Sequence, residues 1–118
     1  MRFLCLYKPG KETHEGPPTQ EELARMGKLI EEMSKAGVLL ATEGCEPSSK
    51  GARLRITEGG KFTVTDGPFP GTKELVAGLA IIQAKSRAEA VEWCKRFLTT
   101  VGEGTSEILQ LRERPPEM

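Results

Sequence analysis

An α+β fold with the element order β-α-β-(hairpin)-β-α-β is predicted by three features of this 118-residue sequence. Two segments open with a helix capping box and continue with apolar residues at helical spacing. Two other runs are apolar on both faces, as strands in the middle of a sheet are. Between them lie two alternating segments joined by glycines, which is typical of a hairpin. We expect one domain over residues 1–118.

The first part of the chain is predicted to form a strand and a helix. Residues 3–7 are an apolar run that ends at Pro9. Thr19 and Glu22 make a capping box, in which the threonine oxygen accepts a backbone N–H and the glutamate reaches back. Gly37 suits the left-handed position that follows a helix. The predicted apolar stripe of this helix consists of Leu23, Met26, Ile30 and Met33.

The middle of the chain is predicted to form a strand over residues 38–41 and a hairpin over residues 53–65. A two-residue Gly59-Gly60 loop would place Ile56 opposite Thr63, an apolar side chain against a polar one. A three-residue loop pairs Ile56 with Phe62 instead. Because cross-strand partners share one face of a hairpin, we predict the three-residue loop.

The last part of the chain repeats the pattern. Residues 75–84 are apolar at both parities, which predicts a strand that is covered on both faces. Ser86 and Glu89 make the second capping box, and Glu92 and Arg96 have the i,i+4 spacing of an ion pair. An alternating segment after Gly102 is predicted to be the last strand. The second apolar stripe consists of Ala90, Val91, Cys94, Phe97 and Leu98.

Two β-α-β units with right-handed crossovers give a ferredoxin-like antiparallel sheet with both helices on one face. In that arrangement residues 3–7 and 75–84 are the central strands, and both are apolar on each side. The helices cover only one of those sides. A second copy of the chain is the simplest cover for the other, through an interface of ~800 Å² per chain, so we predict a homodimer.

The balance of charge argues against nucleic acid or an anionic membrane as a partner. The chain has 17 Lys and Arg against 17 Asp and Glu, whereas both of those partners generally require a basic surface. No apolar segment approaches the ~20 residues of a membrane span. The three cysteines are widely spaced and include no C-x-x-C pair. We expect a cytoplasmic protein.

The best candidate site is the constrained turn over residues 64–74. Asp66 follows a strand and could bind a ligand or accept a proton in a cleft, or its carboxylate could accept from the Phe69 N–H in an Asx-turn. Lys73 and Glu74 could bind an anionic ligand and orient a base at the mouth of a central strand, or form a simple ion pair. The residues alone do not decide between these alternatives.

Three further residues complete the candidates. Phe69 is expected to fill the core or the seam between two copies, and it is also a candidate for contact with a ligand. His14, the only histidine, is either solvated or part of a lid that transfers protons over the cleft. Tyr7 is expected to be a core residue with an exposed hydroxyl at a ligand site. Of the three cysteines, Cys5 and Cys94 are assigned to the core and Cys45 is assigned to an exposed loop. No metal-ligand set or cofactor motif is recognisable, so we expect neither a metal nor a cofactor.

The segment Thr65-Asp-Gly-Pro-Phe-Pro-Gly-Thr-Lys-Glu74 resembles the T-D-G-P-F-A-E-T-K-E motif of the YCII-related family, in its branch named for Asp-Gly-Pro-Phe. The similarity extends to Ala36–Leu39 and Ala90–Trp93. It implies a dimeric α/β barrel with a cleft between sheet and loops, and a regulatory role connected with a sigma factor. Other family members carry a His-Asp dyad. Glu22 and Lys95 or Arg96 stand at those positions here, so the activity of the dyad is not carried over.

Three functions remain open at this point. The first is a small-ligand-binding or regulatory module, in which Asp66 and Lys73 contact the ligand. The second is a cofactor-free enzyme that uses Asp66 or His14 for proton transfer. The third is a protein-interaction partner without a small ligand. Whether the protein is an enzyme is left undecided.

Overall fold

The computed structural model describes residues 1–9, 19–69 and 75–113, and its elements follow the predicted order. They are β1 (Arg2–Pro9), α1 (Gln20–Lys35), β2 (Leu39–Gly44), the short 3₁₀ helix η1 (Ser48–Lys50), β3 (Ala52–Ile56), β4 (Phe62–Asp66), β5 (Gly78–Gln83), α2 (Arg87–Val101) and β6 (Gly104–Gln110). The α+β fold is confirmed.

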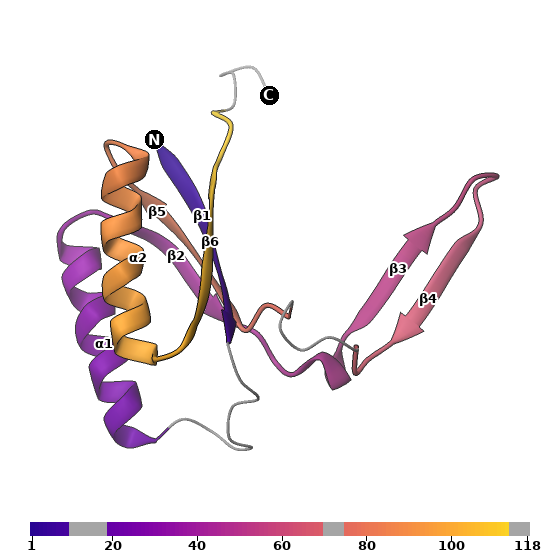
Figure 1. The fold of residues 1–118 in the computed structure, drawn as a ribbon, viewed down its shortest axis with the longest axis horizontal. Helices are drawn as coiled ribbons and strands as arrows, with labels where there is room; N and C mark the ends of the chain where they lie inside the picture. Colours follow the sequence, from indigo (N-terminus) through magenta and orange to yellow (C-terminus); the bar gives the residue numbers. More distant parts are fainter. Residues whose placement is uncertain (10–18, 70–74, 114–118) are drawn as a thin grey trace.

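The four-stranded sheet has the strand order β2-β5-β1-β6, and neighbouring strands are antiparallel. The first strand and the strand before α2 are therefore central, as predicted. Both helices lie on the same side of this sheet (Figure 1). This is the ferredoxin-like arrangement that two interleaved β-α-β units produce.

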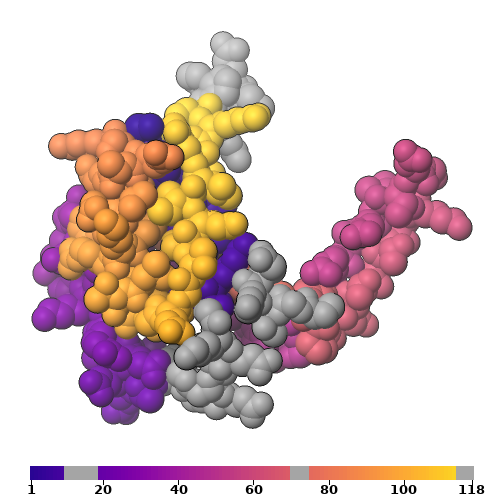
Figure 2. All heavy atoms as spheres, viewed as in Figure 1, coloured from indigo at the N-terminus to yellow at the C-terminus, as the bar shows by residue number. Residues whose placement is uncertain are grey.

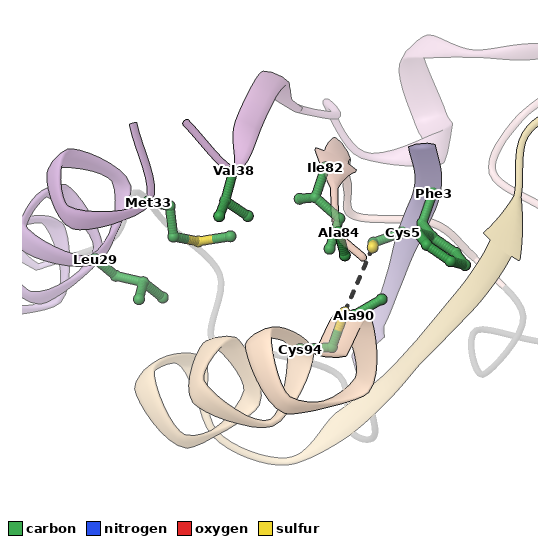
Figure 3. Close-up of a cluster of buried hydrophobic side chains, with 9 residues drawn as sticks. All are labelled: Phe3, Cys5, Leu29, Met33, Val38, Ile82, Ala84, Ala90 and Cys94. Atoms are coloured by element: carbon green, nitrogen blue, oxygen red, sulfur yellow. Dashed lines mark hydrogen bonds between the residues drawn. The ribbon is translucent and has the colours of Figure 1, made fainter. Parts of the chain in front are cut away.

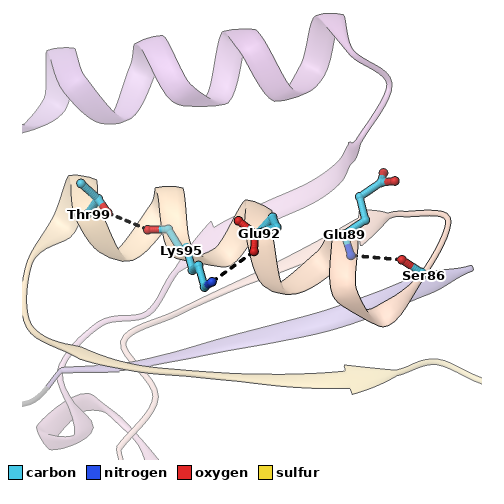
Figure 4. A network of polar contacts seen from close by, with 5 residues as sticks. All are labelled: Ser86, Glu89, Glu92, Lys95 and Thr99. Atoms are coloured by element: carbon cyan, nitrogen blue, oxygen red, sulfur yellow. Dashed lines mark hydrogen bonds and ion pairs between the residues drawn. The ribbon is translucent and has the colours of Figure 1, made fainter.

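In both predicted capping boxes the hydroxyl oxygen of the N-cap residue accepts the expected backbone N–H. The Thr19 hydroxyl oxygen accepts the Glu22 N–H at 3.1 Å, and the Ser86 hydroxyl oxygen accepts the Glu89 N–H at 3.1 Å (Figure 4). At the other end of α1, Gly37 has a φ of 72°, and the following N–H, that of Val38, bonds the Met33 carbonyl at 2.9 Å. This is the Schellman arrangement that a glycine after a helix permits.

The predicted ion pair within α2 is replaced by two others. Glu92 accepts from the Lys95 ammonium at 3.1 Å (Figure 4). Arg96 instead pairs with Glu32 of α1, and its guanidinium carbon lies 5.1 Å from the centre of the Trp93 ring. Arg96 thus ties the outer surfaces of the helices together, a contact that the spacing within α2 alone could not indicate.

The core lies between the helices and one face of the sheet (Figure 3). Its largest fully buried side chains are Phe3 and Ile82, each 1% exposed. Leu23, placed on the α1 stripe by its spacing, is 56% exposed. It lies in the first turn of the helix, at the edge of the cavity described below. The buried cluster consists of Phe3, Cys5, Leu29, Met33, Val38, Ile82, Ala84, Ala90 and Cys94.

Strand boundaries differ from the prediction where pairing partners decide them. β2 continues to Gly44 because Glu43 and Gly44 pair with Leu79 and Gly78. β5 begins only at Gly78, three residues later than the predicted start at Leu75. A strand ends where its ladder of hydrogen bonds ends, and that depends on a segment distant in sequence.

The hairpin has the predicted register, with Ile56 opposite Phe62 and Leu54 opposite Val64. The Thr57 N–H bonds the Lys61 carbonyl at 2.8 Å and closes a loop of three residues, 58–60. β3 and β4 form a separate two-stranded sheet that projects away from the rest of the chain (Figures 1 and 2). The radius of gyration is consequently 16.5 Å, against about 13–14 Å for a compact chain of this length.

The sheet face opposite the helices is apolar at its centre, with Lys8, Glu43 and Glu107 toward one end of it. Alternation along the strands places on it Leu4, Leu6, Leu79, Ile81 and Leu109. We call this set the open sheet face. Within the described residues no helix or strand covers it, because the hairpin extends outward instead of folding over it (Figure 1). The cover predicted for both sides of the central strands is therefore present on the helix side only.

Candidate functional site

A cavity of about 500 Å³ lies between the helices and the sheet. This volume is within the range of about 300–1,000 Å³ that is typical of small-molecule sites. α1 contributes one wall, α2 contributes the other, and the sheet forms the floor. Most of the lining is apolar, and its helical residues are Leu23, Met26, Leu29, Ile30, Met33, Trp93, Cys94, Phe97 and Val101.

The floor of the cavity is hollow because of the row of residues that crosses the sheet there. Gly44, Gly78, Tyr7 and Ser106 are successive partners on β2, β5, β1 and β6. Since two of these four residues are glycines, half of the row places no side chain beneath the helices. The adjacent row contains Thr42, Ala80, Cys5 and Ile108. The hydroxyl groups of Tyr7, Ser106 and Thr42 therefore lie in two adjacent rows at one end of an otherwise apolar space.

Tyr7 is held rigidly at this end. Its ring packs edge-on against Phe97, with centroids 5.4 Å apart and planes at 79°, and its hydroxyl donates to the Glu103 carbonyl at 3.0 Å. A Cβ on Gly104 would lie 2.6 Å from Tyr7 Cε1, so glycine is needed for the ring to fit. Burial raises the pKa of Tyr7. The hydroxyl is thus neutral, with its oxygen still able to accept a hydrogen bond.

Cys5 and Cys94 meet at the same wall of the cavity. Their sulfur atoms are 3.4 Å apart (Figure 3), and both residues are buried. The mutual hydrogen bond is the main cause that raises the pKa of Cys5, with burial acting in the same direction. The same bond lowers the pKa of Cys94 to about 7, while burial opposes this and a hydrogen bond with Ser106 assists it.

The Asp-Gly-Pro-Phe turn lies at the base of the hairpin and not at the cavity. Asp66 is the exposed last residue of β4. The Gly67 N–H bonds the Gly51 carbonyl at 3.0 Å, and a Cβ on Gly67 would lie only 1.6 Å from the carbonyl oxygen of Ser48. The glycine of the motif therefore permits a close approach of two backbone segments. None of the described residues of this turn, 64–69, lines the cavity.

Phe69 is anchored at the same base. Its N–H donates to the hydroxyl oxygen of Ser48 at 3.2 Å, and its half-buried ring lies 4.4 Å from the guanidinium carbon of Arg53. In the Asx-turn that the sequence offered as one alternative, the Asp66 carboxylate would accept this N–H. The Ser48 hydroxyl oxygen accepts it instead. The described part of the motif joins the hairpin to η1. The remaining predicted residues His14, Lys73 and Glu74 lie outside the described residues.

Within the described ranges, no three His, Cys, Asp or Glu side chains come close enough together to hold a metal ion. No helix in those ranges is both long and apolar enough to cross a membrane.

The sequence did not indicate the cavity as such. It identified Tyr7 as a candidate, and assigned Met26, Cys94 and Phe97 to buried stripes. It gave no role to Thr42 or Ser106. The signal that could have revealed them is the pair of glycines at Gly44 and Gly78, because facing glycines on neighbouring strands leave a floor without side chains.

Comparison with known proteins identifies the family of the chain. A search among curated proteins finds none that matches the chain. The profile of the YCII-related domain matches residues 1–113, a span that contains every described element. The chain therefore belongs to the YCII-related family.

Proposed function

We propose that this protein is a small-ligand-binding module that takes a neutral, largely apolar molecule into the cavity between helices and sheet. The observation that supports this is a space of about 500 Å³ with apolar walls and polar groups at one end. An apolar body would pack against the two helices. One polar group of the ligand would meet the Tyr7 oxygen, which is fixed and able to accept.

The lining argues for an uncharged ligand. None of the described residues that line the cavity is Lys or Arg, and the one carboxylate among them, Glu43, is the strand partner of Leu79, which lies on the open sheet face. A carboxylate or phosphate placed there would lose its hydration without gaining a cation, which is costly in an apolar environment. Neutral molecules with one hydroxyl, carbonyl or amide group fit the lining best.

The working unit in this proposal is a homodimer. The hairpin carries a strip of apolar side chains, Leu54, Ile56, Phe62 and Val64, each at least 60% exposed, which we call the hairpin strip. An isolated two-stranded hairpin is marginally stable in water. The open sheet face is also apolar, and a second copy of the chain would cover both surfaces through self-complementary contacts.

The proposal is tested by a thermal-shift screen of neutral and charged metabolites. Ligand at a hundredfold excess over its dissociation constant stabilises the folded state by about 2.7 kcal/mol. The Ala80→Met variant places a flexible side chain in the cavity and is expected to abolish the shift. Ala88→Met, on the exposed side of α2, is the matched control and should respond as the wild type does.

An Asp66→Ala variant distinguishes the cavity from the turn. Retention of the shift in Asp66→Ala, with its loss in Ala80→Met, supports the cavity. The reverse result would contradict our proposal and place the ligand at the turn, where Asp66 would be available for proton transfer. Absence of any ligand would also contradict it and direct attention to a protein partner such as a sigma factor.

A further inference from the structure

Cys5 and Cys94 are brought together by the fold across 89 positions of sequence. Cys5 is on the central strand β1 and Cys94 is on α2, which packs over it (Figure 3). Their sulfur atoms are separated by 3.4 Å. A disulfide has an S–S length of about 2.05 Å, so an approach of about 1.4 Å would join them.

The pair is also accessible to small molecules. Buried cysteines are usually inert because reagents do not reach them. Here both cysteines line the cavity of about 500 Å³, so a small reagent that enters it meets both sulfur atoms. Cys45, the third cysteine, is exposed and takes no part in this pair.

We propose that Cys5 and Cys94 form a redox-active dithiol, which a hydroperoxide entering the cavity oxidises to an internal disulfide. This modification site goes beyond ligand binding and does not depend on the identity of the ligand. It requires only that a small oxidant enters the cavity.

The chemistry balances in two steps. In the first, the Cys94 thiolate attacks one oxygen of hydrogen peroxide, an S–O bond forms, the O–O bond breaks, and the departing hydroxide takes a proton to become water. Cys94 is then a sulfenic acid. In the second, the Cys5 sulfur attacks the Cys94 sulfur, the S–S bond forms, the S–O bond breaks, and the hydroxide leaves as water with the Cys5 proton. Two thiols have lost two electrons, and the peroxide has become two waters.

The surroundings of the two sulfurs support these separate roles. The lowered pKa of Cys94 provides a thiolate near neutral pH, and the thiolate is the species that attacks a peroxide. The raised pKa of Cys5 keeps it a thiol while Cys94 is a thiolate. Once Cys94 is oxidised, the sulfenic oxygen takes the Cys5 proton as the Cys5 sulfur attacks. A thiol reductant would restore the pair through a mixed disulfide, so the modification is reversible.

The test uses the full chain with Cys45→Ser, a substitution at an exposed position that prevents links between chains. The protein is treated with hydrogen peroxide, quenched in acid, denatured and alkylated, and its intact mass is measured. We expect the untreated protein to take up two alkyl groups. The treated protein should take up none, should be lighter by two hydrogen atoms, and should regain both alkylation sites after reduction with dithiothreitol.

Peptide mapping should then show a Cys5–Cys94 link, and the oxidised protein should have a higher melting temperature because the link closes a long loop. Three results would overturn the proposal. The first is that both thiols remain alkylatable, and the second is that Cys94 proceeds to a sulfinic acid without a link. The third is that the link forms as fast in denaturant as in the folded protein, because the fold would then have no part in it. Neither buried cysteine is replaced, so the tested protein keeps its core.

Discussion

Gly67 shows how one missing side chain determines the local structure. A Cβ at this position would lie 1.6 Å from the Ser48 carbonyl oxygen, which is backbone and has little freedom to move. We expect Gly67→Ala to separate the hairpin base from η1 at a cost on the order of 1–3 kcal/mol.

Amide hydrogen exchange measures this effect. The Gly67 N–H, bonded to the Gly51 carbonyl in the wild type, should exchange faster in the variant. Gly44→Ala is the control, because a Cβ there meets nothing within 4 Å. Unaltered protection of the Gly67 N–H would contradict the steric explanation for the glycine of this motif.

Gly104 has the same kind of role at the candidate site. A Cβ there would lie 2.6 Å from Tyr7 Cε1 and 2.8 Å from the Lys8 carbonyl oxygen. Gly104→Ala should destabilise the protein by about 1–3 kcal/mol in urea unfolding. In a Tyr7→Leu background the cost should be smaller, since one of the two clashes is removed. Equal costs in both backgrounds would show that Gly104 does not make room for the tyrosine ring.

The reactivity of Cys94 should depend on pH with a midpoint near its pKa of about 7, against about 8.5 for an ordinary cysteine. The thiolate reacts and the thiol does not, so alkylation should be slow below the midpoint and fast above it. The other described titratable residues of the cavity are Cys5, Tyr7 and Glu43. The pKa of Tyr7 is raised, so it remains neutral over this range.

Rates of iodoacetamide labelling in the Cys45→Ser background, measured on both sides of pH 7, provide the profile. Cys5→Ala removes the hydrogen bond that lowers the pKa of Cys94 most, and should move the midpoint upward. An unchanged midpoint in Cys5→Ala would mean that the partner sulfur does not control the titration.

Helix α1 can be stabilised at one position and weakened at another by the same substitution. Gly27 lies inside the helix with nothing within 4 Å of an added Cβ, so Gly27→Ala should stabilise by about 0.5–1 kcal/mol. Gly37 has a φ of 72° and ends the helix, so Gly37→Ala should destabilise. Urea unfolding compares the two, and a loss of stability in Gly27→Ala would reveal a packing role for this glycine that the structure does not contain.

Elements whose signals are local were predicted well from the sequence. The Thr19 and Ser86 caps and the hairpin register depend on residues a few positions apart. The limits of β2 and β5 depend on pairing between distant segments, and the prediction was wrong there. The cavity was missed for a related reason. It is a volume that the helices leave unfilled, and no short stretch of sequence specifies such a volume.

The whole molecule is predicted to be a dimer by its uncovered apolar surfaces. Light scattering should give twice the mass of one chain. Phe62→Lys, which places a charge on the hairpin strip, should weaken association, because an ammonium buried between two apolar surfaces lacks a counter-ion. Thr63→Lys is the matched control, since alternation puts Thr63 on the other face of β4. A monomeric wild type would contradict the dimer, and equal effects of both variants would exclude the hairpin strip from the interface.

The separation of the hairpin from the four-stranded sheet has a consequence for how such a protein can diverge. The described residues that line the cavity come from the helices, the four-stranded sheet and Ala77 just before β5, and none comes from β3 or β4. Substitutions along β3 and β4 therefore change the hairpin surface and leave the cavity lining as it is. If the proposed dimer and ligand exist, duplicated copies could acquire new pairing preferences without a new ligand, or new ligands without a new partner.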